Sequence, residues 1–310
     1  MNRSAGLRAA LAVSACLFAM HAANAETLPV RGVYPAANDE AAALDTIAIE
    51  AFGGVDGQAI GIAAGDILRA VSVAGEPWFR IVPASARMDA DAVLQGTANA
   101  ESWRRDSGTR EVERCVERDE NRDCIREEKR QIPCWDTVVR LEPRIRLVAA
   151  EGQLIHAMDA GRETARRYCR DDDPPSRESM ISELVDQIAQ QLRYDLAPTD
   201  RLEDIRVMES RDGLQGDDRN AFREAVRLTK SDRAAACAQW EALEPANPEN
   251  VSVLFNLGLC AESADELGQA ESYYRRALMS SSRADYPNQG LARIEARHRA
   301  ASQLDAHYGR

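Results

Sequence analysis

The chain has 310 residues, of which 45% are hydrophobic and 29% are charged, and its formal net charge is −12. This length suits two domains of ordinary size. The acidity disfavours nucleic acid and anionic lipid as partners, because both carry negative charge themselves.

The first 25 residues have the pattern of a cleavable secretory signal peptide. Arg3 and Arg8 supply positive charge, residues 9–20 are almost wholly apolar, and Ala23 and Ala25 are small where a signal peptidase cleaves. The apolar run is too short to remain in a membrane as a helix, and no other segment is long and apolar enough. We therefore expect an exported protein without an integral membrane span, released into the periplasm after cleavage at Ala25.

A lipoprotein signal is the alternative interpretation of the same segment. Residues 13–16, Val-Ser-Ala-Cys, resemble a bacterial lipobox. Cleavage before Cys16 would leave a lipidated outer-membrane protein. Apolar residues continue beyond Cys16, which favours cleavage after Ala25.

The first half of the mature chain alternates between predicted strands and a helix. Residues 26–43 are polar with scattered Pro, Gly and Asn and predict a linker. Residues 44–52 alternate and predict a strand, and residues 58–71 carry one apolar helical stripe. Residues 77–82 and 90–98 predict the next two strands.

A highly charged stretch follows at residues 101–130, and its composition alone is compatible with disorder. Cys115 and Cys124 argue against disorder, because the span between them suits a hairpin closed by a disulfide. Six cysteines follow the signal peptide, and an even number in an oxidising compartment favours disulfides.

Two longer extended segments, residues 134–150 and 153–169, flank Glu151 and Gly152, which suit a two-residue hairpin turn. With that turn, paired residues have numbers that sum to 303, which places Cys134 directly opposite Cys169. The predicted bridge depends on the register, and Pro143 and Gly161 both invite bulges that would shift it.

A helix ends this part of the chain. Ser176 suits its N-cap, and Asp171, Asp172 and Asp173 suit the entry to its N-terminus. The buried stripe is Met180, Ile181, Leu184, Val185, Ile188 and Leu192. We therefore predict that residues 44–200 form an α+β domain, a mixed sheet with helices packed on one face.

Residues 217–310 show no strand pattern and match the tetratricopeptide repeat. Seven consecutive signature positions of that 34-residue pattern are occupied, by Leu254, Leu257, Gly258, Ala261, Ala270, Tyr274 and Ala277. One period earlier, Ala236, Trp240, Leu243 and Pro248 occupy the last four positions. The sequence therefore predicts an all-α repeat domain, closed by a helix over residues 288–307. An unrelated helical hairpin is the alternative.

Stacked repeats offer a concave surface for a protein or peptide partner. The residues expected to line it are Ser252, Phe255, Asn256, Leu259 and Glu262. Phe255 is either the anchor for the partner or part of the repeat core. Cys237 and Cys260 lie on neighbouring predicted helices, where they form a third disulfide or remain two buried thiols.

No motif for catalysis or cofactor binding is evident. The mature histidines, His156, His298 and His307, are far apart in sequence, so a histidine-based triad has no obvious base. No phosphate loop, dinucleotide fingerprint or zinc-protease motif is present. The cysteine spacings are too wide for paired zinc ligands, and the aspartates at 171–173 have no loop that completes a calcium shell. We expect no enzyme activity, metal or cofactor.

The α+β segment resembles a group of bacterial envelope domains. The group comprises the curli-secretion lipoprotein, the lipoprotein activator of penicillin-binding proteins and the amino-terminal domain of the Tol-system translocation protein. The resemblance covers roughly residues 44–196 and rests on Ile47-Ala48-Ile49-Glu50-Ala51-Phe52, the helix ending at Val71, Phe79-Arg80-Ile81-Val82, and Ala90-Asp91-Ala92-Val93-Leu94-Gln95-Gly96. It implies a scaffold or assembly role without catalysis, whereas the charged cysteine hairpin departs from the group.

Together these observations predict a periplasmic scaffold of the bacterial cell envelope that binds a protein partner through its repeats. The alternative is an outer-membrane lipoprotein, lipidated at Cys16, that forms a homo-oligomer in a secretion or envelope-assembly complex.

Overall fold

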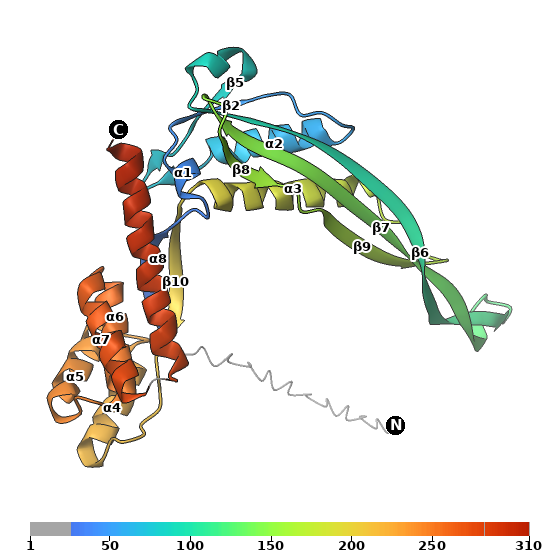
Figure 1. Cartoon of the computed structure of the whole chain (residues 1–310). Coiled ribbons are helices and arrows are strands. Elements are labelled where there is room, and N and C mark those ends of the chain that lie inside the picture. Colours follow the sequence, from blue (N-terminus) through green and yellow to red (C-terminus); the bar gives the residue numbers. More distant parts are fainter. Residues whose placement is uncertain (1–25, 282, 310) are drawn as a thin grey trace, which may run out of the picture.

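The computed structural model describes residues 26–281 and 283–309 (Figure 1). A sheet with two helices forms one part of the molecule, and a group of helices forms the other. The predicted signal peptide, with both of its cleavage sites and Cys16, lies outside the described residues.

The main sheet is mixed, as the sequence predicted. Strand β2 runs parallel to β5 and β6, and the other pairings are antiparallel. The order is β5 (Arg80–Pro83), β2 (Thr46–Ile49), β6 (Ala92–Arg118) and β7 (Cys124–Ala149), with β8 (Leu154–Met158) and β9 (Arg162–Cys169) both paired to β7. A small hairpin of β3 (Ser72–Val73) and β4 (Glu76–Pro77) and a 3-10 helix, η1 (Ala84–Asp89), lie outside this order.

Two helices, α2 (Gly57–Arg69) and α3 (Arg177–Leu196), lie on one side of the sheet (Figure 1). The hydroxyl of Ser176 accepts a hydrogen bond from the Ser179 N–H at 3.2 Å, which makes it the N-cap of α3, as predicted. Both helices bury their apolar stripes against the sheet, with Ile60, Ala64 and Leu68 from α2 and Met180, Leu184, Ile188 and Leu192 from α3. This burial is the main hydrophobic contribution to the first core.

Strands β6 and β7 continue far beyond the sheet. Their pairing begins at Ala92 with Ala149 and ends at Arg118 with Cys124. A register shift between Asp106 and Thr109 interrupts the pairing, and we call residues 109–131, beyond it, the arm. The arm extends away from the rest of the sheet (Figure 1), and none of its side chains is buried. The charged segment that could have been disordered is therefore a hairpin, and a disulfide joins Cys115 to Cys124 near its tip.

Cys134 pairs with Cys169 across β7 and β9, and the two are joined by a disulfide. The predicted register is therefore present, although the predicted turn is not. Val148 pairs with Leu154, which makes the loop between β7 and β8 one residue longer. A bulge between Leu147 and Val148 then restores the predicted register from Leu147 onward.

Residues 26–43 form regular structure, so the linker prediction is wrong. Strand β1 (Thr27–Tyr34) pairs along its whole length with β10 (Thr199–Arg206), and a short helix, α1 (Asp39–Ala42), follows. Leu28 and Val30 alternate toward the helical part and are fully buried there. The partner strand lies far along the chain, so local composition did not indicate the pairing.

The second part consists of helices only, each joined to the next by a short connection. They are α4 (Gly216–Leu228), α5 (Arg233–Leu243), α6 (Val251–Ser263), α7 (Leu267–Ser280) and α8 (Asp285–Tyr308), with a 3-10 turn, η2 (Glu244–Ala246), after α5. The ring of Tyr274 lies against both Gly258 and Gly290, where a Cβ on either glycine would collide with it. These two glycines therefore let α6 and α8 approach α7 closely.

Helix α8 joins the two parts of the molecule (Figure 1). Near its C-terminus, Gln303 exchanges two hydrogen bonds with the backbone of Ala36, at 2.8 and 3.1 Å. The ring of His307 stacks on Trp78 at a centroid distance of 3.9 Å. The first half of α8 packs on α6 and α7. The C-terminal helix that the sequence predicted therefore also connects the sheet to the other helices.

Candidate functional site

The five residues predicted to bind a partner lie on α6, and all five are buried. Ser252 is 4% exposed, and Phe255, Asn256, Leu259 and Glu262 are each 0% exposed. They cannot line an open surface, so this part of the prediction is wrong. The physical reason is that β1, α8 and the segment after β10 cover this face of α6.

Asn256 binds the segment after β10 as a receptor residue binds an extended peptide. Its Oδ1 accepts a hydrogen bond from the Met208 N–H at 2.8 Å, and its Nδ2 donates to the Met208 carbonyl at 3.0 Å. Val207 and Leu214, on either side of Met208, are buried in the helical core. The position expected to hold a partner backbone thus holds the chain's own backbone.

Glu262 is the centre of a buried polar network. Arg293 of α8 donates to both of its oxygens, at 2.9 and 2.7 Å, and the Tyr274 hydroxyl donates at 2.6 Å. Burial, followed by the Glu262 charge, raises the pKa of Tyr274, so this hydroxyl keeps its proton and remains a donor. A buried carboxylate is stable only when it is paired in this way. Glu262 therefore fixes α8 to α6.

Phe255 belongs to the hydrophobic core of the helical part. Its ring contacts Tyr274 and Tyr286 at centroid distances of 5.6 and 5.4 Å, and it shares a hydrophobic cluster with Leu28 of β1. Of the two roles open to Phe255 in the sequence, the structure shows the core role.

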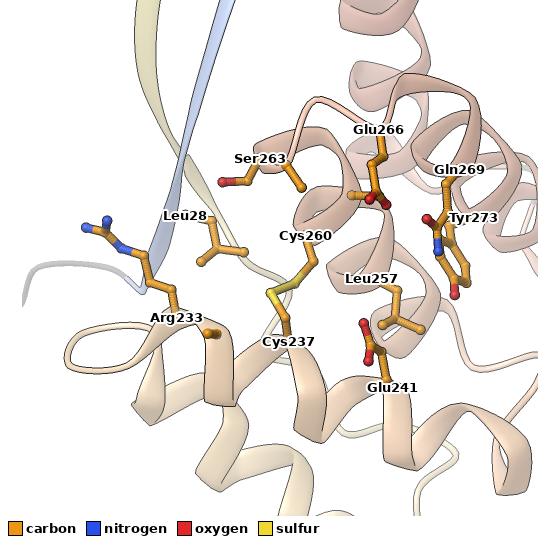
Figure 2. Close-up of a pocket in the computed structure, with 13 residues that line it drawn as sticks. Leu28, Arg233, Cys237, Glu241, Leu257, Cys260, Ser263, Glu266, Gln269 and Tyr273 are labelled. Carbon is orange, nitrogen blue, oxygen red and sulfur yellow. A yellow bond between two sulfur atoms is a disulfide. The ribbon is translucent and has the colours of Figure 1, made fainter.

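A pocket of about 360 Å³ lies beside the third disulfide, between α5, α6 and α7 (Figure 2). Cys237 of α5 and Cys260 of α6 are bonded and half-buried at its edge. The other lining groups are mixed, with Arg233, Glu241 and Glu266 among them. Ser263, also in the lining, donates to the Pro29 carbonyl of β1 at 2.7 Å. The disulfide and this bond hold neighbouring elements together.

The base of the arm is held by the aspartates that precede α3. Arg110 makes two hydrogen bonds to Asp172, at 3.0 and 2.9 Å, and Arg114 binds Asp171 at 2.6 Å. The Arg110 guanidinium and the Cys169 N–H hold the pKa of Asp172 below its usual value. Sequence reasoning assigned these aspartates to a solvated helix entry and missed their role in fixing the arm.

Titratable groups elsewhere are separated. Nε2 of His156 lies 3.3 Å from the Asp195 carboxylate. The other two described histidines, His298 and His307, are both on α8, far from His156 in the sequence. No group of three His, Cys, Asp or Glu residues in the described chain is placed to hold a metal ion. Within the same residues, no helix has the length and apolar composition that a membrane span requires. The three disulfides are consistent with an exported protein.

Comparisons with known proteins give little further information. No family model and no curated protein matches the chain in sequence. A point-substituted PelC dodecamer from Paraburkholderia phytofirmans is 17% identical over 54% of this chain and 97% of that chain, with a TM-score of 0.23. The PelC dodecamer of the same organism is 16% identical over 53% and 96%, with a TM-score of 0.21. TM-scores this low do not establish a shared fold, so no function follows from the similarity.

Proposed function

We propose that this protein is a non-catalytic scaffold of the bacterial envelope, exported to the periplasm, that binds a protein partner through its arm. The observation that carries this proposal is the arm itself. Residues 109–131 project from the sheet without contributing one buried side chain. At about 3.3 Å per residue, each strand of the arm reaches roughly 30 Å from the sheet. An ordered element of this length without a core suits contact with another molecule.

The arm is supported as a rigid element. The Cys115–Cys124 disulfide closes the tip, and the Cys134–Cys169 disulfide lies immediately beyond the base. Ion pairs cross between its strands, with Lys129 bound to Glu111 at 2.8 Å. A pre-ordered binding element loses less conformational entropy on association than a mobile loop does.

We further propose that residues 217–310 are a tetratricopeptide-repeat unit with a structural role. The packing of Tyr274 against Gly258 supports the repeat assignment. In this proposal, β1 and residues 207–214 fill the concave face of the repeats. The repeats then support α8, which in turn contacts the sheet domain. The resemblance of residues 44–196 to the curli-secretion and penicillin-binding-protein-activator lipoproteins fits a scaffold role.

Shortening the arm tests the proposal. Glu111 pairs with Gln131, so replacing residues 112–130 by Asn-Gly gives a two-residue hairpin and keeps the Arg110–Asp172 contact. We expect an unchanged melting temperature. In native gels of envelope extracts, we expect the full chain to migrate in a complex and the shortened chain to migrate alone.

Met279→Ser, at a residue that is 86% exposed on α7, is the control and should migrate as the full chain does. Identical migration of the full and shortened chains would contradict the proposal. The mass of the mature N-terminus tests the location separately. Glu26 as the first residue supports release into the periplasm, and a lipidated Cys16 supports an outer-membrane anchor.

A further inference from the structure

Helix α2 exposes apolar side chains on the face that the sheet does not cover. Over Gly57–Arg69, the polar side chains are those of Gln58, Asp66 and Arg69. Ile60 and Leu68 face the sheet and are 0% exposed, whereas Ile62, on the opposite face, is 57% exposed. The polar residues Gln58, Asp66 and Arg69 are exposed on the same side as Ile62. The outer face of α2 thus presents an exposed isoleucine among charged and polar groups, a pattern suited to an amphipathic partner.

Helix α3 provides the second wall of a groove at this face. The groove has a volume of about 760 Å³. Its apolar lining is Ala59, Ile62, Ala63 and Ile67 from α2 and Ile181, Val185 and Ala189 from α3. From Asp56 to Ile67 it follows three turns of α2, roughly 16 Å at 1.5 Å per residue. This length suits a segment of about eleven helical residues.

The N-terminal ends of α2 and α3, the two walls of the groove, are both attached to Ala100 of β6. The Ala100 N–H donates to the Asp56 carboxylate at 2.7 Å, and Arg177 donates to the Ala100 carbonyl at 3.2 Å. Both helices therefore begin at the same point of β6 and run side by side from it (Figure 1). The groove is a preformed feature of the folded chain.

The rim of the groove is acidic. Four carboxylates line it, and Arg177 is the one cation among the lining residues; the carboxylates are Asp56, Asp66, Glu178 and Asp186. Arg177 is already engaged at Ala100. The carboxylate of Asp186 is exposed and makes no hydrogen bond or ion pair with any residue that the structure describes, whereas Asp66 is paired with Arg69. An apolar floor with this rim is complementary to an apolar segment flanked by cations.

We propose that the α2–α3 groove binds an amphipathic helix of a partner protein, with aliphatic residues on one face and Lys or Arg beside them. The helix would lie along α2 with its apolar face over Ile62. One cation would meet Asp186, and another would join Arg69 at Asp66, where Arg69 already donates a hydrogen bond at 3.0 Å. This mode is a helix-in-groove contact. It is separate from the arm, so the two proposals fail independently.

A helix-forming peptide of sixteen residues, with Leu and Ala on one face and Lys on its flanks, is the probe. Calorimetry with the full mature chain should show binding that Ile62→Asp weakens about tenfold or more. The matched control is Leu202→Asp on β10, because Leu202 is 62% exposed and lies outside the groove. It should bind as the unchanged chain does.

Two further measurements make the result decisive. A scrambled peptide of equal charge should bind at least about tenfold more weakly, because general attraction to an acidic protein does not depend on an apolar face. Equal binding of both peptides, or equal effects of the two Asp substitutions, would overturn the proposal. Sedimentation of the chain alone should show no self-association that Ile62→Asp removes. Such self-association would assign the groove to a second copy and also overturn the proposal.

Discussion

Asn256 of α6 holds the backbone of Met208 through two hydrogen bonds, one from the Met208 N–H and one to its carbonyl. A side-chain amide that bonds both the backbone N–H and the backbone carbonyl of one residue holds an extended segment in place. This contact does not depend on which side chain that residue carries. The segment after β10 therefore occupies the helical part of the molecule as an internal ligand. This contact explains why the surface expected to bind a partner is closed.

Replacing Asn256 by Ala should loosen the Met208 segment. The substitution removes both hydrogen bonds to the partly buried backbone of Met208, at a cost of about 1 kcal/mol for each bond. We expect a lower midpoint of urea unfolding and faster proteolysis within residues 207–214. Asn220→Ala, on the exposed face of α4, is the control. If both variants unfold at the unchanged midpoint, the contact does not stabilise the segment.

Removing the charge of Glu262 should be more costly, because Glu262→Gln leaves the guanidinium of Arg293 largely buried beside a neutral amide. Breaking a buried ion pair in this way typically destabilises a protein by about 3–5 kcal/mol. Combining Glu262→Gln with Arg293→Met should recover part of the loss. Urea unfolding of the two single variants and the double variant measures the coupling. Additive losses would show that the pair does not act as a unit.

Two of the three disulfides, Cys134–Cys169 and Cys115–Cys124, should differ in what they stabilise. Cys134 and Cys169 are buried and close a loop of 35 residues, so replacing both by Ala should lower the unfolding free energy by about 3–4 kcal/mol. Replacing Cys115 and Cys124 by Ser should leave the melting temperature nearly unchanged. It should increase hydrogen exchange only within residues 109–131. Faster exchange in α2 or α3 of the Ser variant would contradict this local role.

Stability should fall as the pH is lowered through the titration of His156. Burial lowers the pKa of His156 in the folded state, against a smaller opposing effect of Asp195. The unfolded chain therefore binds more protons below pH 6.5, the ordinary value, so the unfolding free energy decreases from there down to the folded-state pKa.

Unfolding in urea between pH 5 and about 7.5 measures this slope. His156→Gln should reduce the slope, because one titrating group is removed. Asp195→Asn removes a charge that raises the pKa of His156, so the decrease should extend to lower pH. An unchanged slope in His156→Gln would exclude His156 as its source.

The sequence indicated local structure better than it indicated what covers each surface. The stripe of α3 and its Ser176 cap follow from residues within one helix. The Cys134–Cys169 pairing was also correct, although the bulge beside Leu147 compensated for an incorrect turn. In contrast, β1 pairs with a strand some 170 residues away, and its alternation of Leu28, Val30, Gly32 and Tyr34 was the one local indication.

The predicted binding residues failed for the same physical reason. The pattern of α6 predicted a face that meets another polypeptide segment, and Asn256 does bind an extended backbone there. Local sequence contains no information on whether that backbone belongs to another molecule or to residues 207–214. For the arm, the composition alone suggested disorder, whereas the structure shows an ordered hairpin. Ion pairs between its two strands, such as Lys129 with Glu111, stabilise it, and composition does not reveal which charges are paired.

Site-specific photo-crosslinking in living cells tests the central claim, that the arm contacts the partner, most directly. A photoreactive residue would replace Ile125, which is 60% exposed on the arm, and in a second strain Met279, which is 86% exposed on α7. The account predicts a discrete crosslinked product from position 125 and none from position 279. A product from position 279 with none from position 125 would contradict it.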